Sequence, residues 1–113
     1  MENDKVQRIN ELCSQFIDDV QLGKVWFEGS DDFPYGCCGS VSEKLCELME
    51  REGLSGATYK WGWRANQSHA WVEYDDLIID VTISQFPEYQ GSKIFIEQKD
   101  QKGIHQEFIH DGN

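Results

Sequence analysis

The spacing of the apolar residues changes near Gly53, and this change constrains the fold more than any other feature. Before Gly53, apolar residues recur three or four positions apart, which is the period of an amphipathic helix. We therefore expect one helix over residues 4–22 and a second from Cys37 or Cys38 to Glu52, with Gly53 ending it. The expected buried stripe of the second helix is Val41, Leu45, Leu48 and Met49.

Most of the chain after Gly53 is predicted to form strands, because β-branched and aromatic residues dominate and apolar residues alternate with polar ones. Asp75 and Asp76 can form a tight turn between two of these strands. The expected strands, including a short one before the second helix, are residues 25–27, 57–63, 68–74, 77–82, 93–97 and 104–109. Helices followed by an antiparallel meander define an α+β fold, and 113 residues fit a single domain over residues 1–113.

The chain is strongly acidic, with 21 Asp and Glu against 10 Lys and Arg and a net charge of −11. Such a field repels phosphate backbones, so we expect no binding of nucleic acid. The charge indicates either a well-solvated surface or a basic protein or peptide as substrate or partner, and composition alone does not decide between them. No stretch contains the ~18–20 apolar residues that a membrane helix needs. Residues 1–10 also lack the apolar core of a secretory signal. We therefore expect a cytoplasmic protein with no membrane segment, and nothing indicates its oligomeric state.

The cysteines and histidines do not have the spacing of a structural zinc site. The cysteines are Cys13, Cys37, Cys38 and Cys46, and the histidines are His69, His105 and His110. Since no C-x-x-C pair occurs and the histidines are scattered, we expect no metal and no other cofactor. A reducing cytosol also disfavours disulfides. The thiols are therefore expected to be core residues or to carry chemistry.

The Gly36-Cys37-Cys38-Gly39 segment joins a loop rich in turn-forming residues to the second helix. A cysteine in the first turn of a helix is suited to nucleophilic attack, because the helix dipole stabilises its thiolate. At about 100° per residue, Cys38 lies about 35° from the direction of the buried stripe and Cys37 about 65°. We expect Cys38 to face the sheet and to be the nucleophile. The competing interpretation of Cys38 is a small buried residue of the core.

His69 and Asp80 lie on the two strands that the Asp75-Asp76 turn joins. This turn places Asp80 opposite Trp71, which shares a face with His69 because residues two apart on a strand point the same way. The carboxylate is then diagonal to the imidazole, and a register shift would make the two residues direct partners. A buried carboxylate needs a partner, so we expect His69 to donate to Asp80, which fixes the imidazole tautomer.

Three blocks of sequence resemble a known family. They are Phe-Pro-Tyr-Gly-Cys-Cys-Gly-Ser-Val-Ser at 33–42, Ser-His-Ala-Trp-Val-Glu at 68–73 and Ile-Asp-Val-Thr-Ile-Ser-Gln-Phe at 79–86. In content and order they resemble small bacterial transglutaminase-like proteins of the papain fold. The resemblance implies N-terminal helices packed on an antiparallel sheet. It also implies a catalytic triad in which Cys38 is the nucleophile, His69 the base and Asp80 its orienting acid.

The activity implied is thiol-dependent acyl transfer: hydrolysis of an amide or peptide bond, or deamidation or transamidation of glutamine, in a protein or peptide. The backbone N–H of Cys38 is the expected first oxyanion donor. Candidates for the second donor are Trp26, Trp61, Trp63, Asn66 and Gln85. A competing interpretation is a catalytically inactive acidic binding module or inhibitor on the same fold.

Other residues have less specific expectations. Trp71 is expected in the core. At least one of Trp61 and Trp63 is also expected there, and their functional interpretation is the wall of a groove for an extended peptide. His105 and His110 are expected to be solvated residues of the C-terminal tail.

Overall fold

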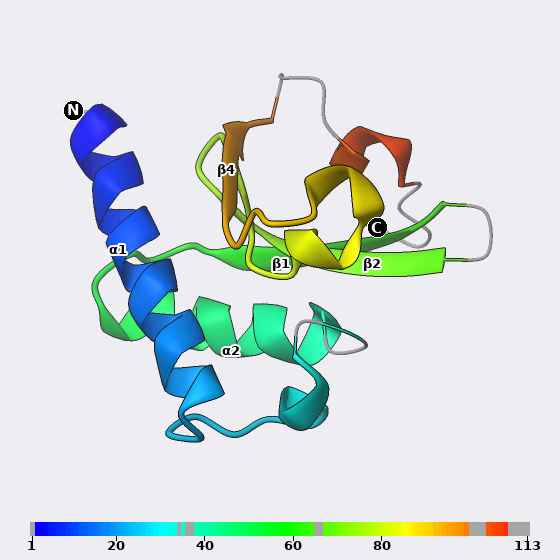
Figure 1. The fold of residues 1–113 in the computed structure, drawn as a ribbon. Coiled ribbons are helices and arrows are strands. Elements are labelled where there is room, and N and C mark those ends of the chain that lie inside the picture. The colour runs from blue at the N-terminus through cyan, green and yellow to red at the C-terminus, as the bar shows by residue number, and fades with distance from the viewer. Residues whose placement is uncertain (1, 34, 36–37, 65–66, 100–103, 109–113) are drawn as a thin grey trace.

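The computed structural model describes residues 2–33, 35, 38–64, 67–99 and 104–108, without the side chains of residues 2, 3 and 38. Two helices precede four strands, which form one antiparallel sheet in the order β1-β2-β3-β4 (Figure 1). The bounds are α1 Glu2–Gln21, α2 Cys38–Arg51, β1 Thr58–Arg64, β2 Gln67–Tyr74, β3 Leu77–Asp80 and β4 Phe95–Gln98. The short 3-10 helices are η1 Ser30–Asp32, η2 Ile83–Gln85, η3 Pro87–Tyr89 and η4 Ile104–Glu107. The expected α+β class is confirmed.

Both helices form where the apolar periodicity predicts them. The stripe of α1 that enters the core consists of Ile9, Cys13, Phe16, Ile17 and Val20. In α2, Val41, Leu45 and Met49 are buried as expected, and Leu48 is partly buried. The expected C-terminal glycine of α2 is confirmed, because Gly53 has φ +85° and the next N–H, of Leu54, donates to the carbonyl of Met49 at 2.8 Å. In the described part of the chain, no helix is long and apolar enough to cross a membrane.

The turn between β2 and β3 sets the register on which the site depends. Asp75 has φ +54°, a left-handed conformation that aspartate tolerates better than most residues. Tyr74 pairs with Leu77 and Val72 with Ile79, which is the register predicted from the turn. Continuing this register by one residue places Asp80 beside Trp71. No register shift is needed to bring the two strands together as expected.

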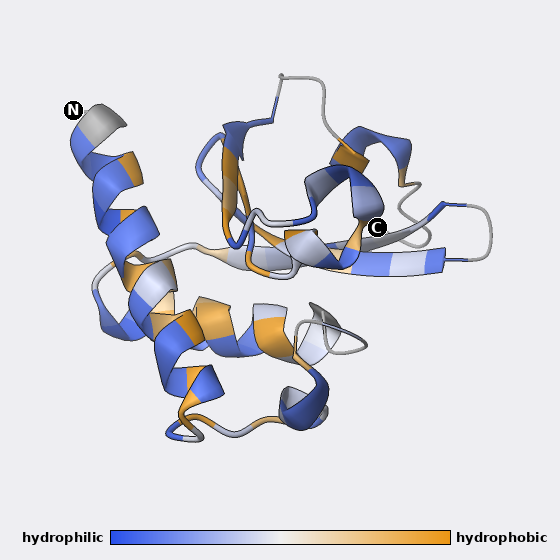
Figure 2. Cartoon of the chain, viewed as in Figure 1, coloured by the Kyte–Doolittle hydropathy of each residue, from blue (hydrophilic) through white to orange (hydrophobic). Residues whose placement is uncertain are grey.

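The sheet separates two apolar clusters. The first joins α1 and α2 to the face of the sheet that carries Val72 and Ile79. The second lies on the opposite face, where η2, η3 and η4 cover Trp71 and Ile78 (Figure 1). Figure 2 shows that the hydrophobic residues of α1 and α2 gather where the helices meet each other and the sheet. Each strand therefore presents alternate residues to different surroundings.

Two of the predicted strands do not form. Residues 25–27 are not a strand: Phe27 is buried in the core and stacks on Phe16, with ring centroids 6.4 Å apart. Residues 104–107 form η4, because Ile104 and Phe108 are four apart and both are buried on one side of this turn. Residue 109 of that predicted strand lies outside the described residues.

Truncation of Ile79 to alanine should destabilise the protein by about 2–5 kcal/mol. Ile79 is completely buried where the helices meet β3, so the substitution removes apolar contacts and leaves a cavity. The matched control is Leu22→Ala, since Leu22 is 70% exposed and its truncation should change stability by about 0.5 kcal/mol or less. Urea unfolding measures both variants, and equal losses of stability would show that Ile79 is not in the core.

Candidate functional site

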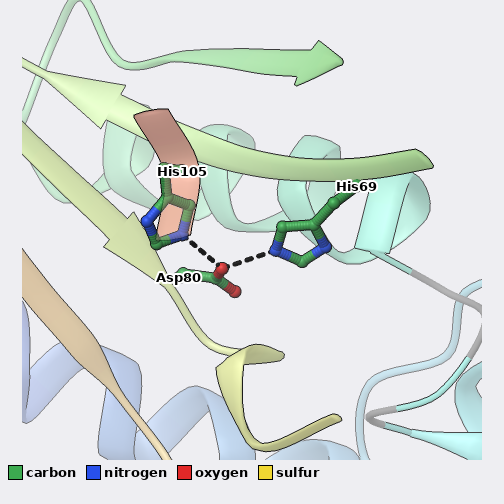
Figure 3. Close-up of side chains that lie close together, drawn as sticks. All are labelled: His69, Asp80 and His105. Atoms are coloured by element: carbon green, nitrogen blue, oxygen red, sulfur yellow. Dashed lines mark hydrogen bonds and ion pairs between the residues drawn. The ribbon is translucent and has the colours of Figure 1, made fainter. Parts of the chain in front are cut away.

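His69 and Asp80 form the centre of the site. Both side chains are buried, and Nε2 of His69 lies 2.6 Å from Oδ2 of Asp80 (Figure 3). The imidazole enters from β2 and the carboxylate from the end of β3, and continuing the strand register places Asp80 beside Trp71, two residues from His69. The predicted diagonal pair of His69 and Asp80 is therefore confirmed.

A second histidine completes this cluster. Nε2 of His105 lies 2.7 Å from the same Oδ2 of Asp80, and Figure 3 shows the two imidazole rings on either side of the carboxylate. His105 is only 2% exposed, so the expectation of a solvated tail residue is wrong for it. This role of His105 was not predicted from the sequence. A signal was present, because Ile104 and Phe108 flank it four residues apart, and this helical spacing indicates that the segment packs on the sheet. His110 lies outside the described residues.

The other carboxylate oxygen is held by the chain that follows β3. Oδ1 of Asp80 accepts from the backbone N–H of Thr82 at 2.9 Å and from its hydroxyl at 3.1 Å. The side-chain amide of Gln85 lies 3.2 Å from the hydroxyl oxygen of Thr82 and 3.2 Å from Nδ1 of His69. Asp80, Thr82, Gln85 and His69 thus form a closed circuit of hydrogen bonds, built largely from residues 80–85.

The ionisation of Asp80 determines which histidine nitrogens carry protons in this circuit. Burial alone would raise the pKa of Asp80, but the hydrogen bonds from His105 and His69, and their charges, lower that pKa far below its usual range. Asp80 is therefore an ionised group that only accepts, and both Nε2 atoms must carry protons. When His69 is neutral, its Nδ1 therefore carries a lone pair and is the ring atom that can accept a proton.

Aromatic rings surround the cluster. Phe86 meets His69 edge-on with centroids 4.7 Å apart, and Phe95 lies 4.7 Å from His105. Trp71 lies close to both histidines, with ring centroids 5.8 Å from that of His69 and 5.0 Å from that of His105, and its predicted place in the core is confirmed. Because these rings exclude water, the hydrogen bonds to Asp80 act in a medium of low dielectric constant and are stronger than in solution.

Two histidines and an aspartate also have the composition of a metal site. One ligand atom from each of His69, Asp80 and His105 lies within 4.8 Å of the others. Two ligands of a tetrahedral zinc ion are about 3.3 Å apart, given Zn–N distances of about 2.0–2.1 Å. The Nε2–Oδ2 distances of 2.6 and 2.7 Å are shorter than this and are ordinary for charge-assisted hydrogen bonds. This geometry favours a hydrogen-bonded network.

The third expected catalytic residue is only partly placed. Cys38 is the first residue of α2, but its side chain and all of Cys37 lie outside the described residues. Gly39, which follows Cys38, lines a surface pocket of about 260 Å³ together with Ser68 and His69. The N-terminus of α2 and the beginning of β2 therefore meet at one pocket. The described cluster itself is His-Asp-His, without a cysteine.

The His69 side chain lies on the face of the sheet opposite the helices, which the expected direction of Cys38 on its helix did not indicate. Val72 of β2 packs against the helices, whereas His69 and Trp71 belong to the opposite face. However, β3 pairs with β2 only from Val72 to Tyr74, so residues 67–71 have no β3 partner on that side.

The structure also sorts the candidate oxyanion donors. The side-chain amide of Gln85 lies beside the His69 ring. Trp61 and Trp63 line the same pocket as His69, but at 37% and 45% exposure neither is in the core, which corrects the expectation for these two residues. Trp26 lines a different pocket, and Asn66 lies outside the described residues.

No family model matches the chain, and no curated protein and no solved structure matches it at a significant level. Assignment of a function therefore depends on the chemistry of the site and on the sequence motifs that contain it.

The stability of the protein should depend on pH through Asp80. The pKa of Asp80 is lower in the folded state than the ~3.9 of an unfolded chain, so Asp80 contributes stability above about pH 4. That contribution is lost as the pH falls further and the folded carboxylate is protonated. We expect the free energy of unfolding to fall more steeply below about pH 4 in the wild type than in Asp80→Asn.

The control for this prediction is Asp31→Asn, which changes an exposed aspartate on η1 and should keep the wild-type pH dependence. Urea unfolding at several pH values between about 2 and 6 measures the slopes. The same slope for Asp80→Asn and the wild type would mean that the buried ion pair does not stabilise the folded state.

Proposed function

We propose that the protein is a thiol-dependent acyl-transfer enzyme with a papain-like or transglutaminase-like site. In this proposal Cys38 is the nucleophile, His69 the general base and Asp80 the acid that orients it. The observation that carries the proposal is the hydrogen bond from Nε2 of His69 to Asp80, which leaves Nδ1 as the basic atom. The same arrangement of an acid behind a histidine serves nucleophilic catalysis in unrelated folds.

The position of Cys38 at the start of α2 supports its role as nucleophile. The positive end of the helix dipole stabilises a thiolate there, and the adjoining Gly39 shares a pocket with His69. Cys13 and Cys46 are in the opposite situation. Burial raises the pKa of Cys13 to about 12, and burial with the negative charges of Glu43 and Glu47 raises that of Cys46 to about 11. Neither thiol forms a thiolate readily near neutral pH.

The reaction would proceed in two halves. Nδ1 of His69 takes the thiol proton, the sulfur bonds to the carbonyl carbon, and the imidazolium then returns that proton to the departing amine as the C–N bond breaks. Water or an amine next attacks the thioester, giving up a proton through His69, and the C–S bond breaks to restore the thiol. The buried charge of Asp80 stabilises the imidazolium at both stages.

Gln85 has two roles in this proposal. While Nδ1 of His69 is unprotonated, the amide N–H of Gln85 donates to its lone pair, at 3.2 Å. Because it lies beside the atom that exchanges the proton, the same amide is the best placed of the candidates to donate to the carbonyl oxygen, together with the backbone N–H of Cys38. When the ring is protonated, rotation of the amide can present its oxygen to the ring instead.

The surface next to the site supports a peptide as substrate. β1 is at the edge of the four-stranded sheet, and Tyr59, Trp61 and Trp63 line the pocket shared with Gly39 and His69. An exposed strand edge can bind an extended chain through main-chain hydrogen bonds, while aromatic side chains form pockets for alternate residues. The net charge of −11 favours a basic peptide over an acidic one.

The second candidate function is a binding module without catalysis. The observation that favours it is the row of exposed aromatic residues on β1, which would bind a peptide whether or not chemistry follows. The two functions differ in one property: only the enzyme requires a cysteine whose reactivity depends on His69.

Alkylation by iodoacetamide near pH 6 should label Cys38 at least about 100-fold faster than Cys13 or Cys46. A cysteine paired with an imidazolium is largely thiolate at this pH, whereas ordinary thiols with a pKa near 8.5 are well under 1% ionised. His69→Ala should remove this advantage, because the thiolate loses its counter-ion. Peptide mass mapping measures the rate at each cysteine.

Two further variants resolve the neighbouring thiols in this experiment. Cys37→Ser should keep the fast phase of labelling and Cys38→Ser should abolish it. Persistence of the fast phase in Cys38→Ser would move the nucleophile to Cys37. If the cysteines of the wild type all react at similar slow rates, the enzymatic function is wrong and the binding module is favoured.

Replacement of Trp61 or Trp63 by alanine should weaken binding of peptides near the site. Loss of an aromatic contact of this kind costs about 1–3 kcal/mol, or about 5- to 150-fold in KM or Kd, with little change in the alkylation rate of Cys38. Trp26→Ala is the matched control, because Trp26 is 72% exposed and lines a different pocket. A basic peptide library screened for turnover or binding gives the comparison. Equal effects of all three variants would exclude β1 as the peptide surface.

A further inference from the structure

The C-terminal segment brings a second imidazole to the carboxylate of Asp80. η4 is held on the sheet by the buried side chains of Ile104 and Phe108 and by an ion pair between Arg64 and Glu107, with N···O 3.0 Å. The guanidinium of Arg64 also lies 5.1 Å from the ring centroid of Phe108. This docking places His105 in the aromatic cluster about 35 residues along the chain from His69, although the three-block motif does not include it.

The hydrogen bonds of His105 define what it can do. Its Nε2 donates to Oδ2 of Asp80, and in the described part of the chain its buried Nδ1 has no hydrogen-bond partner. The ring is therefore not an intermediate in a proton relay among these residues, because a relay needs a partner at each nitrogen. Its polar contact is directed at the carboxylate that also holds His69.

We propose that His105 is a positioning residue, which shares Oδ2 of Asp80 with His69 and so sets both the orientation of the carboxylate and the charge it offers to the catalytic base. This inference rests on the proposed function in assigning His69 as the base. Two N–H donors at Oδ2, together with the backbone N–H and the hydroxyl of Thr82 at Oδ1, fix the carboxylate in one position. They also divide its negative charge, so that His69 receives less of it than in a simple pair.

Among the residues that the structure describes, few charged groups lie around the two rings. Asp80 of β3 faces both rings, and Arg64 of β1 reaches the rim of the cluster, where Glu107 of η4 and Glu88 of η3 pair with it at 3.0 and 3.9 Å. The side of β4 that contacts His105 contributes the ring of Phe95. A change at His105 therefore acts on His69 mainly through Asp80.

The test compares His105→Phe, which keeps a ring but has no donor, with His105→Gln, whose Nε2 can replace that of histidine. NMR titration of the His69 ring is carried out in a Cys38→Ser background, so that the thiol plays no part. With His105→Phe the midpoint of His69 should rise by about one pH unit, because the whole charge of Asp80 then stabilises the imidazolium. His105→Gln should return the midpoint toward that of the Cys38→Ser parent, which retains His105. An unchanged midpoint in His105→Phe, in a protein that is folded by circular dichroism, overturns the proposal.

A second measurement needs no substitution at His105. Two hydrogen-bonded Nε2–H protons, from His69 and His105, should appear at low field in the proton spectrum of the wild type and exchange slowly with solvent. Absence of the His105 signal overturns the proposal even if the variants do not fold. Because neither measurement uses the reactivity of Cys38, failure of this inference is distinguishable from failure of the enzymatic function.

Discussion

The charge of Asp80 is the constraint on which the site depends. An ionised carboxylate removed from water costs several kcal/mol unless its lone pairs are used. Here four described donors satisfy it: His69 and His105 at Oδ2, and the backbone N–H and hydroxyl of Thr82 at Oδ1. These donors come from three requirements of the fold: the β2–β3 register for His69, the docking of η4 for His105 and the bend after β3 for both groups of Thr82. The arrangement therefore joins segments distant in sequence into one polar centre within an aromatic core.

The parts of this structure that depend on local pattern could be predicted from sequence. The periodicity of α1 and α2, the glycine that ends α2 and the turn at Asp75 all form as expected, and the turn alone was enough to place Asp80 diagonal to His69. The failures concern contacts between segments far apart in the sequence, since the helical spacing of Ile104 and Phe108 indicates that their segment docks but not which residue His105 then meets. His105 reaches Asp80 only because η4 docks on the far face of the sheet. At least one of Trp61 and Trp63 is expected in the core, yet both stay partly exposed on β1.

The proposed chemistry follows from the protons that this network fixes. A carboxylate that only accepts requires protons on both Nε2 atoms, and this leaves Nδ1 of His69 as the base. The amide of Gln85 lies beside this atom. The pocket lined by Gly39, Trp61 and Trp63 borders His69 from the other face of β2, because these tryptophans pair with Ala70 and Ser68, whose side chains point away from the His69 ring. The amide of Gln85 and the His69 ring thus lie on one face of β2, and the start of α2 and the exposed aromatic residues of β1 lie at a pocket on its other face. The proposed acyl transfer assigns the nucleophile to Cys38, the first residue of α2.

The most direct test of the account is to locate the protons on the His69 ring by ¹⁵N NMR near neutral pH, in the wild type and in Cys38→Ser. The account predicts a proton on Nε2 in both proteins, because Asp80 holds it there. It predicts a proton on Nδ1 only in the wild type, where Cys38 has supplied it to form a thiolate–imidazolium pair. An unprotonated Nε2 would contradict the role of Asp80 in holding the proton on that nitrogen. A His69 ring in the same state in both proteins would contradict the pairing of His69 with Cys38.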